Sequence, residues 1–272
     1  MTRTQKFVKY CAIALAIFLI VSIFSGIIDL FTSIIFAFSK DSDWVGEMKP
    51  ITLSDTESIK NLDITVSAAE LEIKNGEVFS LESNAKYLKA QIKNDTLLIE
   101  EDIPFRLNRG NSVKVILTIP TDFSFERTEF ETGAGKIFVE SLSVGKLRME
   151  LGAGETRFEN LIVSDDAEIE TGIGEFSILG GRIADLDLQM GVGDVSIKTA
   201  LSGECELDCG ISNTDLCLIG EKDDYRISVN KGVGSATVNG EKISNDEEFG
   251  NGNVTVEING GIGDIRIQFA RE

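Results

Sequence analysis

A Gly-x-Gly motif that recurs at regular intervals along the second half of this 272-residue chain is the feature that most constrains its fold. Counted with Gly210 as a degenerate member, the first spacings are 19, 20, 19 and 19 residues, and the last two are 22 and 29. The glycine pairs are Gly133/Gly135, Gly152/Gly154, Gly172/Gly174, Gly191/Gly193, Gly232/Gly234 and Gly261/Gly263. A fixed period of about 20 residues indicates a repeat architecture in which each unit stacks on its neighbours.

Apolar residues alternate with polar residues on both sides of each glycine pair. Leu147 and Met149 flank an arginine before the second pair, for example, and Phe176 and Ile178 follow the third pair. Such period-two alternation predicts strands with one buried face. Glycine suits a corner that needs a positive φ or a close backbone approach. We therefore predict an all-β fold, a single-stranded parallel β-helix or β-solenoid with coils of about 19–22 residues.

Both ends of the repeat depart from this pattern. Residues 64–73 repeat the unit with Ala68 and Ala69 in place of the glycines, and short strand-like runs follow. We expect residues 51–127 to form an irregular first part of the solenoid or a lid over its N-terminal end, since open strand edges invite pairing. The insertion at residues 239–253 accounts for the 29-residue spacing and is expected to protrude as a hairpin or loop.

An apolar segment near the N-terminus predicts a membrane anchor. Residues 10–28 are 19 consecutive uncharged residues, and a helix of that length measures roughly 28 Å, close to the hydrocarbon thickness of a bilayer. Arg3, Lys6 and Lys9 precede it, so the positive-inside rule favours a cytoplasmic N-terminus. A cleaved signal peptide is the alternative, but this stretch is longer than an ordinary h-region.

These observations predict four parts in chain order. Residues 1–9 are a cytoplasmic tip, residues 10–38 are a single transmembrane helix with an interfacial extension, and residues 39–50 are a linker. Residues 51–272 are the β-solenoid, displayed outside a bacterial cell membrane. The lipid bilayer is therefore one expected partner of the chain.

The charge of the chain excludes several classes of function. The net charge is −19 and there is no histidine, which excludes His-ligated metal sites and nucleophiles that need a histidine base. Residues 41–272 hold 22 basic and 44 acidic residues, a net charge of −22. A chain this acidic lacks the positive surface that nucleic-acid binding requires.

The sequence offers residues for two kinds of site, but it predicts no catalytic, cofactor-binding or metal-binding residue. Four acidic residues directly follow glycine pairs (Glu155, Glu175, Asp194 and Asp264), while Lys136 and Ser235 occupy that place in two other units. Calcium-binding nonapeptide repeats need another spacing, so a solvated acidic edge is favoured over a calcium site. Paired carboxylates also serve glycosidases, but the expected ectodomain has only two tyrosines, Tyr87 and Tyr225, and its one tryptophan, Trp44, is expected at the membrane, so a surface for stacking on sugars is lacking. No cofactor is predicted.

Three cysteines lie within one repeat unit. Cys205 and Cys209 share the parity of the buried positions and are expected to act as small core hydrophobes, whereas Cys217 alternates outward. Zinc would need a fourth ligand, and no histidine is present to supply it. A disulfide is allowed outside the cytoplasm, but free core thiols are favoured.

Several segments together resemble a bacterial family of domains of unknown function known as "putative adhesins". They are the N-terminal anchor, VSAAELEIKNG at residues 66–76, LTIP at 117–120, and the tandem units ETGAGKIFVE, ELGAGETRFE, ETGIGEFSIL and QMGVGDVSIK. The resemblance covers residues 50–270 and implies a surface-displayed solenoid without supplying any site residue.

The leading hypothesis for function is non-enzymatic binding or scaffolding at the cell envelope, with the broad strand-lined faces as the working surface. The partner is an unidentified envelope protein or polysaccharide. A regulatory or stress-sensing partner of a membrane protein is the first alternative, and a polysaccharide-acting enzyme is a weaker one. Self-association into filaments is not favoured, because like-charged surfaces repel within a Debye length of about 8 Å.

Overall fold

The structure is a computed structural model that describes residues 45–101, 113–244 and 247–271. The predicted tip at 1–9 and anchor at 10–38 lie outside the described residues. Within the ranges given above, no helix has the length and apolar character needed to cross a membrane.

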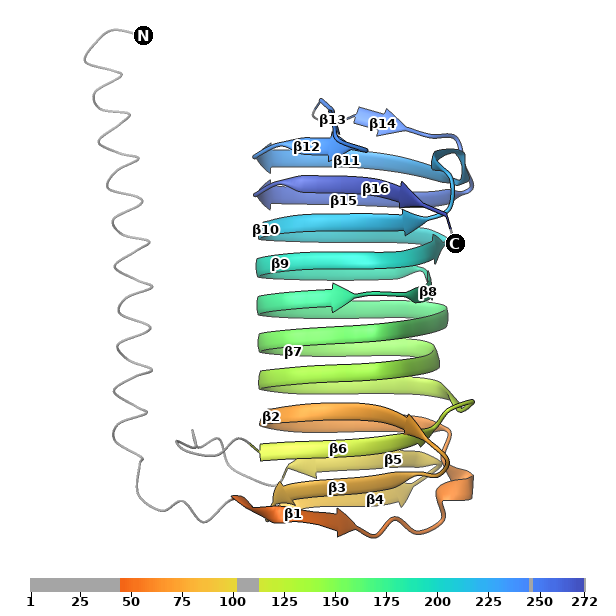
Figure 1. The fold of residues 1–272 in the computed structure, drawn as a ribbon, viewed down its shortest axis with the longest axis vertical. Coiled ribbons are helices and arrows are strands. Elements are labelled where there is room, and N and C mark those ends of the chain that lie inside the picture. Colours follow the sequence, from red (N-terminus) through yellow and green to blue (C-terminus); the bar gives the residue numbers. More distant parts are fainter. Residues whose placement is uncertain (1–44, 102–112, 245–246, 272) are drawn as a thin grey trace, which may run out of the picture. The chain divides into compact units, whose positions relative to one another are not determined.

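The described residues form one sheet of sixteen strands that winds into a stack of coils (Figure 1). Two single-turn 3-10 helices, Thr56–Ser58 and Lys222–Asp224, lie in connections. The strands are β1 Val45–Ile51, β2 Asn61–Gly76, β3 Ser80–Ala85, β4 Leu88–Lys93, β5 Thr96–Glu101, β6 Val113–Pro120, β7 Ser124–Ile178, β8 Gly181–Ala184, β9 Leu186–Ser202, β10 Glu204–Ile219, β11 Tyr225–Val233, β12 Ala236–Val238, β13 Glu241–Lys242, β14 Glu247–Phe249, β15 Val254–Ile262 and β16 Ile265–Ala270.

Neighbouring coils pair in parallel, and equivalent repeat positions stand in register. Gly174 of β7 pairs with Gly193 of β9, for example, and Ile211 of β10 pairs with Val192 of β9. In β7, β9 and β10 the strand bends through the glycine corner without interruption, at the left-hand edge of the stack in Figure 1, whereas β11 and β15 end within the motif at Val233 and Ile262. The prediction of an all-β parallel solenoid is confirmed.

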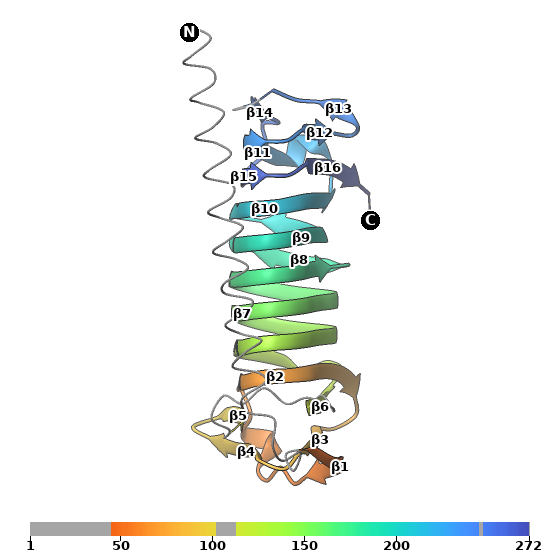
Figure 2. The same ribbon diagram turned by 90° about the vertical axis from the view of Figure 1, so that its left-hand side faces the viewer.

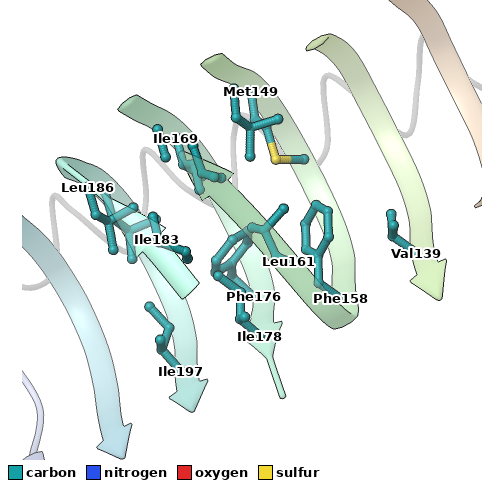
Figure 3. Close-up of a cluster of buried hydrophobic side chains, with 14 of the residues drawn as sticks. Val139, Met149, Phe158, Leu161, Ile169, Phe176, Ile178, Ile183, Leu186 and Ile197 are labelled. Carbon is teal, nitrogen blue, oxygen red and sulfur yellow. The ribbon is translucent and has the colours of Figure 1, made fainter. Parts of the chain in front are cut away.

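The core lies inside the coils and is built from the alternating apolar positions. Phe158 and Phe176 are both at most 1 % exposed, and their ring centroids lie 6.3 Å apart on adjacent coils. Figure 3 shows these rings beside Leu161, Ile178 and Ile183, in the space that the coils enclose. Each coil thus buries its apolar face against the coils above and below it, as the alternation predicted.

The second glycine of each pair has a conformation and a position that exclude a side chain. Its φ is between 140° and 149° wherever the motif is complete. A Cβ built on Gly174 would lie 1.7 Å from the carbonyl oxygen of Gly154 in the preceding coil. In β10, Ser212 stands at this position opposite Gly193 and does not adopt a positive φ.

The coils do not stack in chain order throughout, which corrects the expectation of a simple sequential solenoid. The last segments, β15 and β16, lie between β10 on one side and β11 with β12 on the other. At the opposite end, β2 lies between β7 and the pair β5 and β6. The long spacings near the C-terminus arise because the chain passes over one coil position and returns to fill it.

Antiparallel strands cover both ends of the stack. At the N-terminal end β4 pairs with β5, β3 with β6, and β1 with β3. At the other end β14 pairs with β11, and β13 with β12. A covered edge cannot recruit another chain, which gives the caps a physical purpose.

The structure refines four expectations about the two ends of the repeat. The irregular N-terminal part does contain a lid, but β2 within it is already a regular coil. Residues 239–253 supply β13 and β14 of the C-terminal cap rather than a free protrusion. The linker expected at 39–50 overlaps β1. Finally, Ala69 stands opposite Gly135, but it is Ser67 rather than Ala68 that lies at Gly133.

Candidate interaction surface

The residue between the two glycines of each motif projects from the stack. In the last five coils this residue is a branched aliphatic, and its exposed fraction is between 37 % and 69 %. These residues are Ile173, Val192, Ile211, Ile262 and Val233, given in their order along the stack. Elsewhere in the repeat, Ala134 and Ala153 hold the same place.

The five side chains form one continuous row because their residues are paired in register. Val192 pairs with both Ile173 and Ile211, and Ile262 pairs with both Ile211 and Val233. We call this row the aliphatic ridge. It follows the Gly-x-Gly edge that faces the viewer in Figure 2, over β7, β9, β10, β15 and β11.

Two polar rows border the aliphatic ridge, and we call them the flanking rows. The first, two residues before each glycine pair, contains Glu170, Gln189, Asp208, Asn259 and Asn230. The second, directly after each pair, contains Glu175, Asp194, Asn213, Asp264 and Ser235. Five of these ten residues are acidic and none is basic. One lysine, Lys231, precedes Gly232 in the outermost coil.

Hydrogen bonds order the second flanking row. Asn213 donates from its amide nitrogen to Asp194 at 2.9 Å. Ser235 donates its backbone N–H and its hydroxyl to Asp264, at 2.9 Å and 2.8 Å. These two bonds hold the pKa of Asp264 below its ordinary value. The carboxylate of Asp264, beside the aliphatic ridge, is therefore charged at neutral pH.

The four carboxylates weighed as calcium ligands belong to this same edge, but the structure does not bring all four together. Glu155, Glu175 and Asp194 lie on successive coils, whereas Asn213 separates Asp194 from Asp264. Lys136 donates to Glu155 at 2.6 Å, which lowers the pKa of that carboxyl. Among the residues that the structure describes, no group of three or more acidic or cysteine side chains could hold a metal ion.

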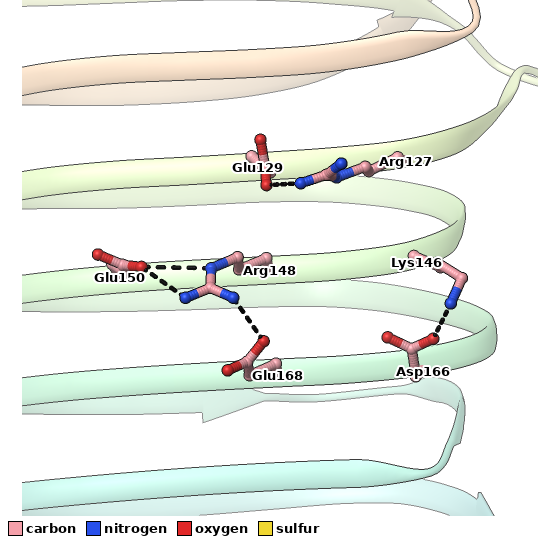
Figure 4. A network of polar contacts seen from close by, with 7 residues as sticks. All are labelled: Arg127, Glu129, Lys146, Arg148, Glu150, Asp166 and Glu168. Atoms are coloured by element: carbon pink, nitrogen blue, oxygen red, sulfur yellow. Dashed lines mark hydrogen bonds and ion pairs between the residues drawn. The ribbon is translucent and has the colours of Figure 1, made fainter.

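The broad face formed by the strand segments that precede each glycine pair in the sequence is also acidic. Its charge is distributed unevenly along the stack. In the N-terminal coils, arginine and lysine pair with the acids (Figure 4). Arg148 donates to Glu150 and to Glu168, each at 2.9 Å, and Lys146 donates to Asp166 at 2.7 Å. These pairs are exposed and contribute little to stability, but they neutralise the surface locally.

Further along the same face, carboxylates lie next to one another. Asp187, Glu206 and Glu257 are in register on successive coils. The pKa of Glu206 is raised, first by the charge of Asp208, then by burial and by the charges of Glu257 and Asp187. Asn259 donates its amide to Asp208 at 2.9 Å. The aliphatic ridge therefore lies beside the most acidic part of the solenoid.

The three cysteines of the repeat are free thiols. Cys205 and Cys209 are buried and Cys217 is half-buried, as predicted. Burial raises the pKa of Cys205 to about 11 and also raises that of Cys209. A thiol that stays protonated at neutral pH is a poor nucleophile, so these cysteines act as core residues.

The aliphatic ridge is not among the features predicted from the sequence, which points to the broad strand faces as the working surface. A signal was nevertheless present. The middle residue of the motif changes from alanine in the first two units to isoleucine or valine in every later one. Period-two alternation assigns buried positions within strands, but it does not say which way a residue at a glycine corner points.

Comparisons with known proteins agree with the resemblance drawn from the sequence. The family model described as "Toastrack DUF4097" matches residues 59–271. No curated protein matches the chain.

Several solved structures also match the chain. The first is a "putative cell adhesion protein" from Clostridium sporogenes, with 15 % identity and a TM-score of 0.34, covering 82 % of this chain and 99 % of its own. A "putative adhesin" from Bacteroides fragilis has 11 % identity and a TM-score of 0.33, covering 81 % and 96 %. A "putative lipid binding protein" from Parabacteroides distasonis has 13 % identity and a TM-score of 0.36, covering 80 % and 96 %.

Proposed function

The chain belongs to the Toastrack DUF4097 family, and from that premise we propose that it is a non-enzymatic binding or scaffolding protein of the bacterial cell envelope. The observation that carries this proposal is the aliphatic ridge, an exposed apolar row set between charged rows. Contiguous exposed apolar surface of this kind marks interaction sites.

The proposal includes an anchor and an orientation. Residues 10–38 would hold the chain in the bilayer as a single span, with the basic tip at 1–9 in the cytoplasm and the solenoid outside. The charge distribution supports this topology, because the tip carries only basic charges while residues 41–272 have a net charge of −22.

The chemistry of the described residues supports a non-enzymatic role. The thiols of Cys205 and Cys209 are buried and protonated. Carboxylates such as Glu175 and Asp194 lie exposed on the outside of the coils, whereas a general acid is ordinarily a carboxyl group in a desolvated site. A polysaccharide-acting enzyme is therefore the weaker alternative.

Two reporter fusions test the topology. Alkaline phosphatase fused after residue 272 of the full chain should be active, because it folds only outside the cytoplasm, and a green fluorescent protein fused there should stay dark. A matched chain lacking residues 10–28 should reverse both signals and leave the membrane fraction. Bright fluorescence from the full-length fusion would contradict the proposed topology.

The binding role needs a separate experiment. A membrane-impermeant crosslinker applied to intact cells that produce the full chain should join the solenoid to an envelope component. In a second form of the experiment, a photoreactive residue replaces Ile211 on the ridge. The control carries the same photoreactive residue in place of Ser196, which lies outside the ridge. Turnover of envelope polysaccharide by the purified chain would contradict the non-enzymatic assignment.

A further inference from the structure

We propose that the aliphatic ridge is the docking site for an amphipathic α-helix of a partner protein, one whose apolar stripe is bordered by lysine and arginine. This inference rests on the proposed function, since it requires that the solenoid acts by binding. It adds the place of contact and the chemistry of the partner.

The fold does not require aliphatic residues along the ridge. The side chain between the glycines points away from the core, and alanine suffices there at positions 134 and 153. Ile173, Ile211 and Ile262 are nevertheless each more than half exposed. Exposure of large aliphatic groups to water opposes solubility and adds nothing to the packing of the core. A contact outside the solenoid explains their presence.

The backbone along the inner part of the ridge is already paired on both sides, which excludes strand addition there. Ile211, for example, lies in a strand paired in parallel on both sides, with Val192 and with Ile262. The ridge therefore offers side chains rather than free N–H and C=O groups to a partner. Recognition by apolar side chains in a row is the mode used by amphipathic helices.

The spacing of the ridge suits a helix that lies along the stack. Successive coils are about 4.8 Å apart, so the five side chains extend over about 19 Å. A helix with apolar residues every 3.5 residues on average presents one about every 5.2 Å. About four helical turns can thus follow the ridge with an accumulated mismatch of only about 2 Å.

The flanking rows decide which occupant fits. Glu170 and Asp208 lie on one side of the ridge, and Glu175, Asp194 and Asp264 lie on the other. Lysine and arginine at the borders of an apolar stripe would lie opposite these carboxylates. An anionic lipid surface would instead be repelled by both rows.

A second copy of this chain fits less well. Two ridges face to face would bring like-charged rows together. A helix set between the two rows gains charge pairs on both sides as well as the apolar contact.

The test uses the full chain in nanodiscs of zwitterionic lipid. The probe is a fluorescent, helix-stabilised 16-residue peptide with leucine along one stripe and lysine on both borders, and its binding is followed by anisotropy. A matched peptide carries glutamate in place of lysine. The ridge variant replaces Ile173, Ile211 and Ile262 with serine, and the control variant, Ile162→Ser, alters an exposed isoleucine at the opposite edge of the coils. Empty nanodiscs give the background.

We expect the lysine peptide to bind the parent chain and the Ile162→Ser variant equally, and the ridge variant at least tenfold more weakly. Added salt should weaken binding, and the glutamate peptide should not bind. Thermal unfolding of the ridge variant should match the parent, because the altered side chains lie outside the core.

Three results would overturn the proposal. They are equal binding by the ridge variant, equal binding of the glutamate peptide, and a parent dimer in sedimentation that the ridge variant abolishes. The last would assign the ridge to a second copy. Binding in nanodiscs does not depend on location in the cell, so failure here is distinct from failure of the reporter fusions.

Discussion

Replacement of Gly174 by alanine should separate two coils of the solenoid. Gly174 has a φ of 147°, and a Cβ there would lie 1.7 Å from the carbonyl oxygen of Gly154 and 2.7 Å from its carbonyl carbon. An ordinary contact begins at 3.4 Å. The two backbones would therefore have to move apart by well over 1 Å, which a hydrogen bond between coils does not survive.

The magnitude follows from three contributions. A positive φ costs an alanine about 1–2 kcal/mol, and forcing an extra methyl group into a packed site costs about 1–3 kcal/mol. One or two lost hydrogen bonds add about 0.5–1.5 kcal/mol each. Together they predict a loss of about 2.5–8 kcal/mol, a large share of the 5–15 kcal/mol that stabilises an ordinary domain.

Gly240 provides a matched control. It also has a positive φ, 83°, but a Cβ there would meet nothing within 4 Å. Gly240→Ala should therefore lose only the backbone contribution, about 1–2 kcal/mol.

The full-length parent and both variants are unfolded with urea in the same detergent, and unfolding is monitored by circular dichroism. If Gly174→Ala loses no more stability than Gly240→Ala, the close approach of the coils does not explain the glycines, and the reasoning fails.

Three further predictions concern the core and the acidic face. Thr128→Val should stabilise the chain by about 1 kcal/mol or more, because the Thr128 hydroxyl is buried and has no hydrogen-bond partner among the described residues. The control Thr214→Val removes a hydroxyl that is hydrogen-bonded to that of Ser212 and should not stabilise the chain. A urea midpoint for Thr128→Val no higher than the parent's would refute this. Glu206→Gln should raise the urea midpoint slightly at pH 7, since the raised pKa of Glu206 means that its charged form is disfavoured in the folded chain. Because the folded pKa lies above the unfolded one, this gain in stability should fade as the pH falls through the folded pKa and vanish below about 4.5. A gain that persists at pH 3 would contradict the prediction. In the native chain an alkylating reagent should modify Cys217 well before Cys205, because Cys205 is buried and its pKa is about 11. Mass spectrometry of tryptic peptides measures the two rates. Equal rates would mean that this part of the core opens readily.

The regular part of the fold follows from local sequence, whereas its ends do not. Alternation such as Leu186, Leu188 and Met190 assigns the buried face directly, and the glycine period assigns the coil length. The order of the last coils does not follow from local sequence, because β15 pairs in parallel with both β10 and β11. A repeat that makes all coils alike cannot by itself specify which neighbour each coil takes.

The same reasoning explains why the candidate site was the least predictable part. Burial constrains Phe176 and Ile178 through their neighbours on adjacent coils, so their identity can be read from the repeat. The residue between two glycines has no neighbours inside the coil, and the fold accepts alanine there. Stacking therefore does not determine which residue stands there, and its identity can reflect another requirement. Isoleucine or valine in five consecutive layers of the stack cannot be attributed to the solenoid, and a partner that contacts those five layers together accounts for both their chemistry and their continuity.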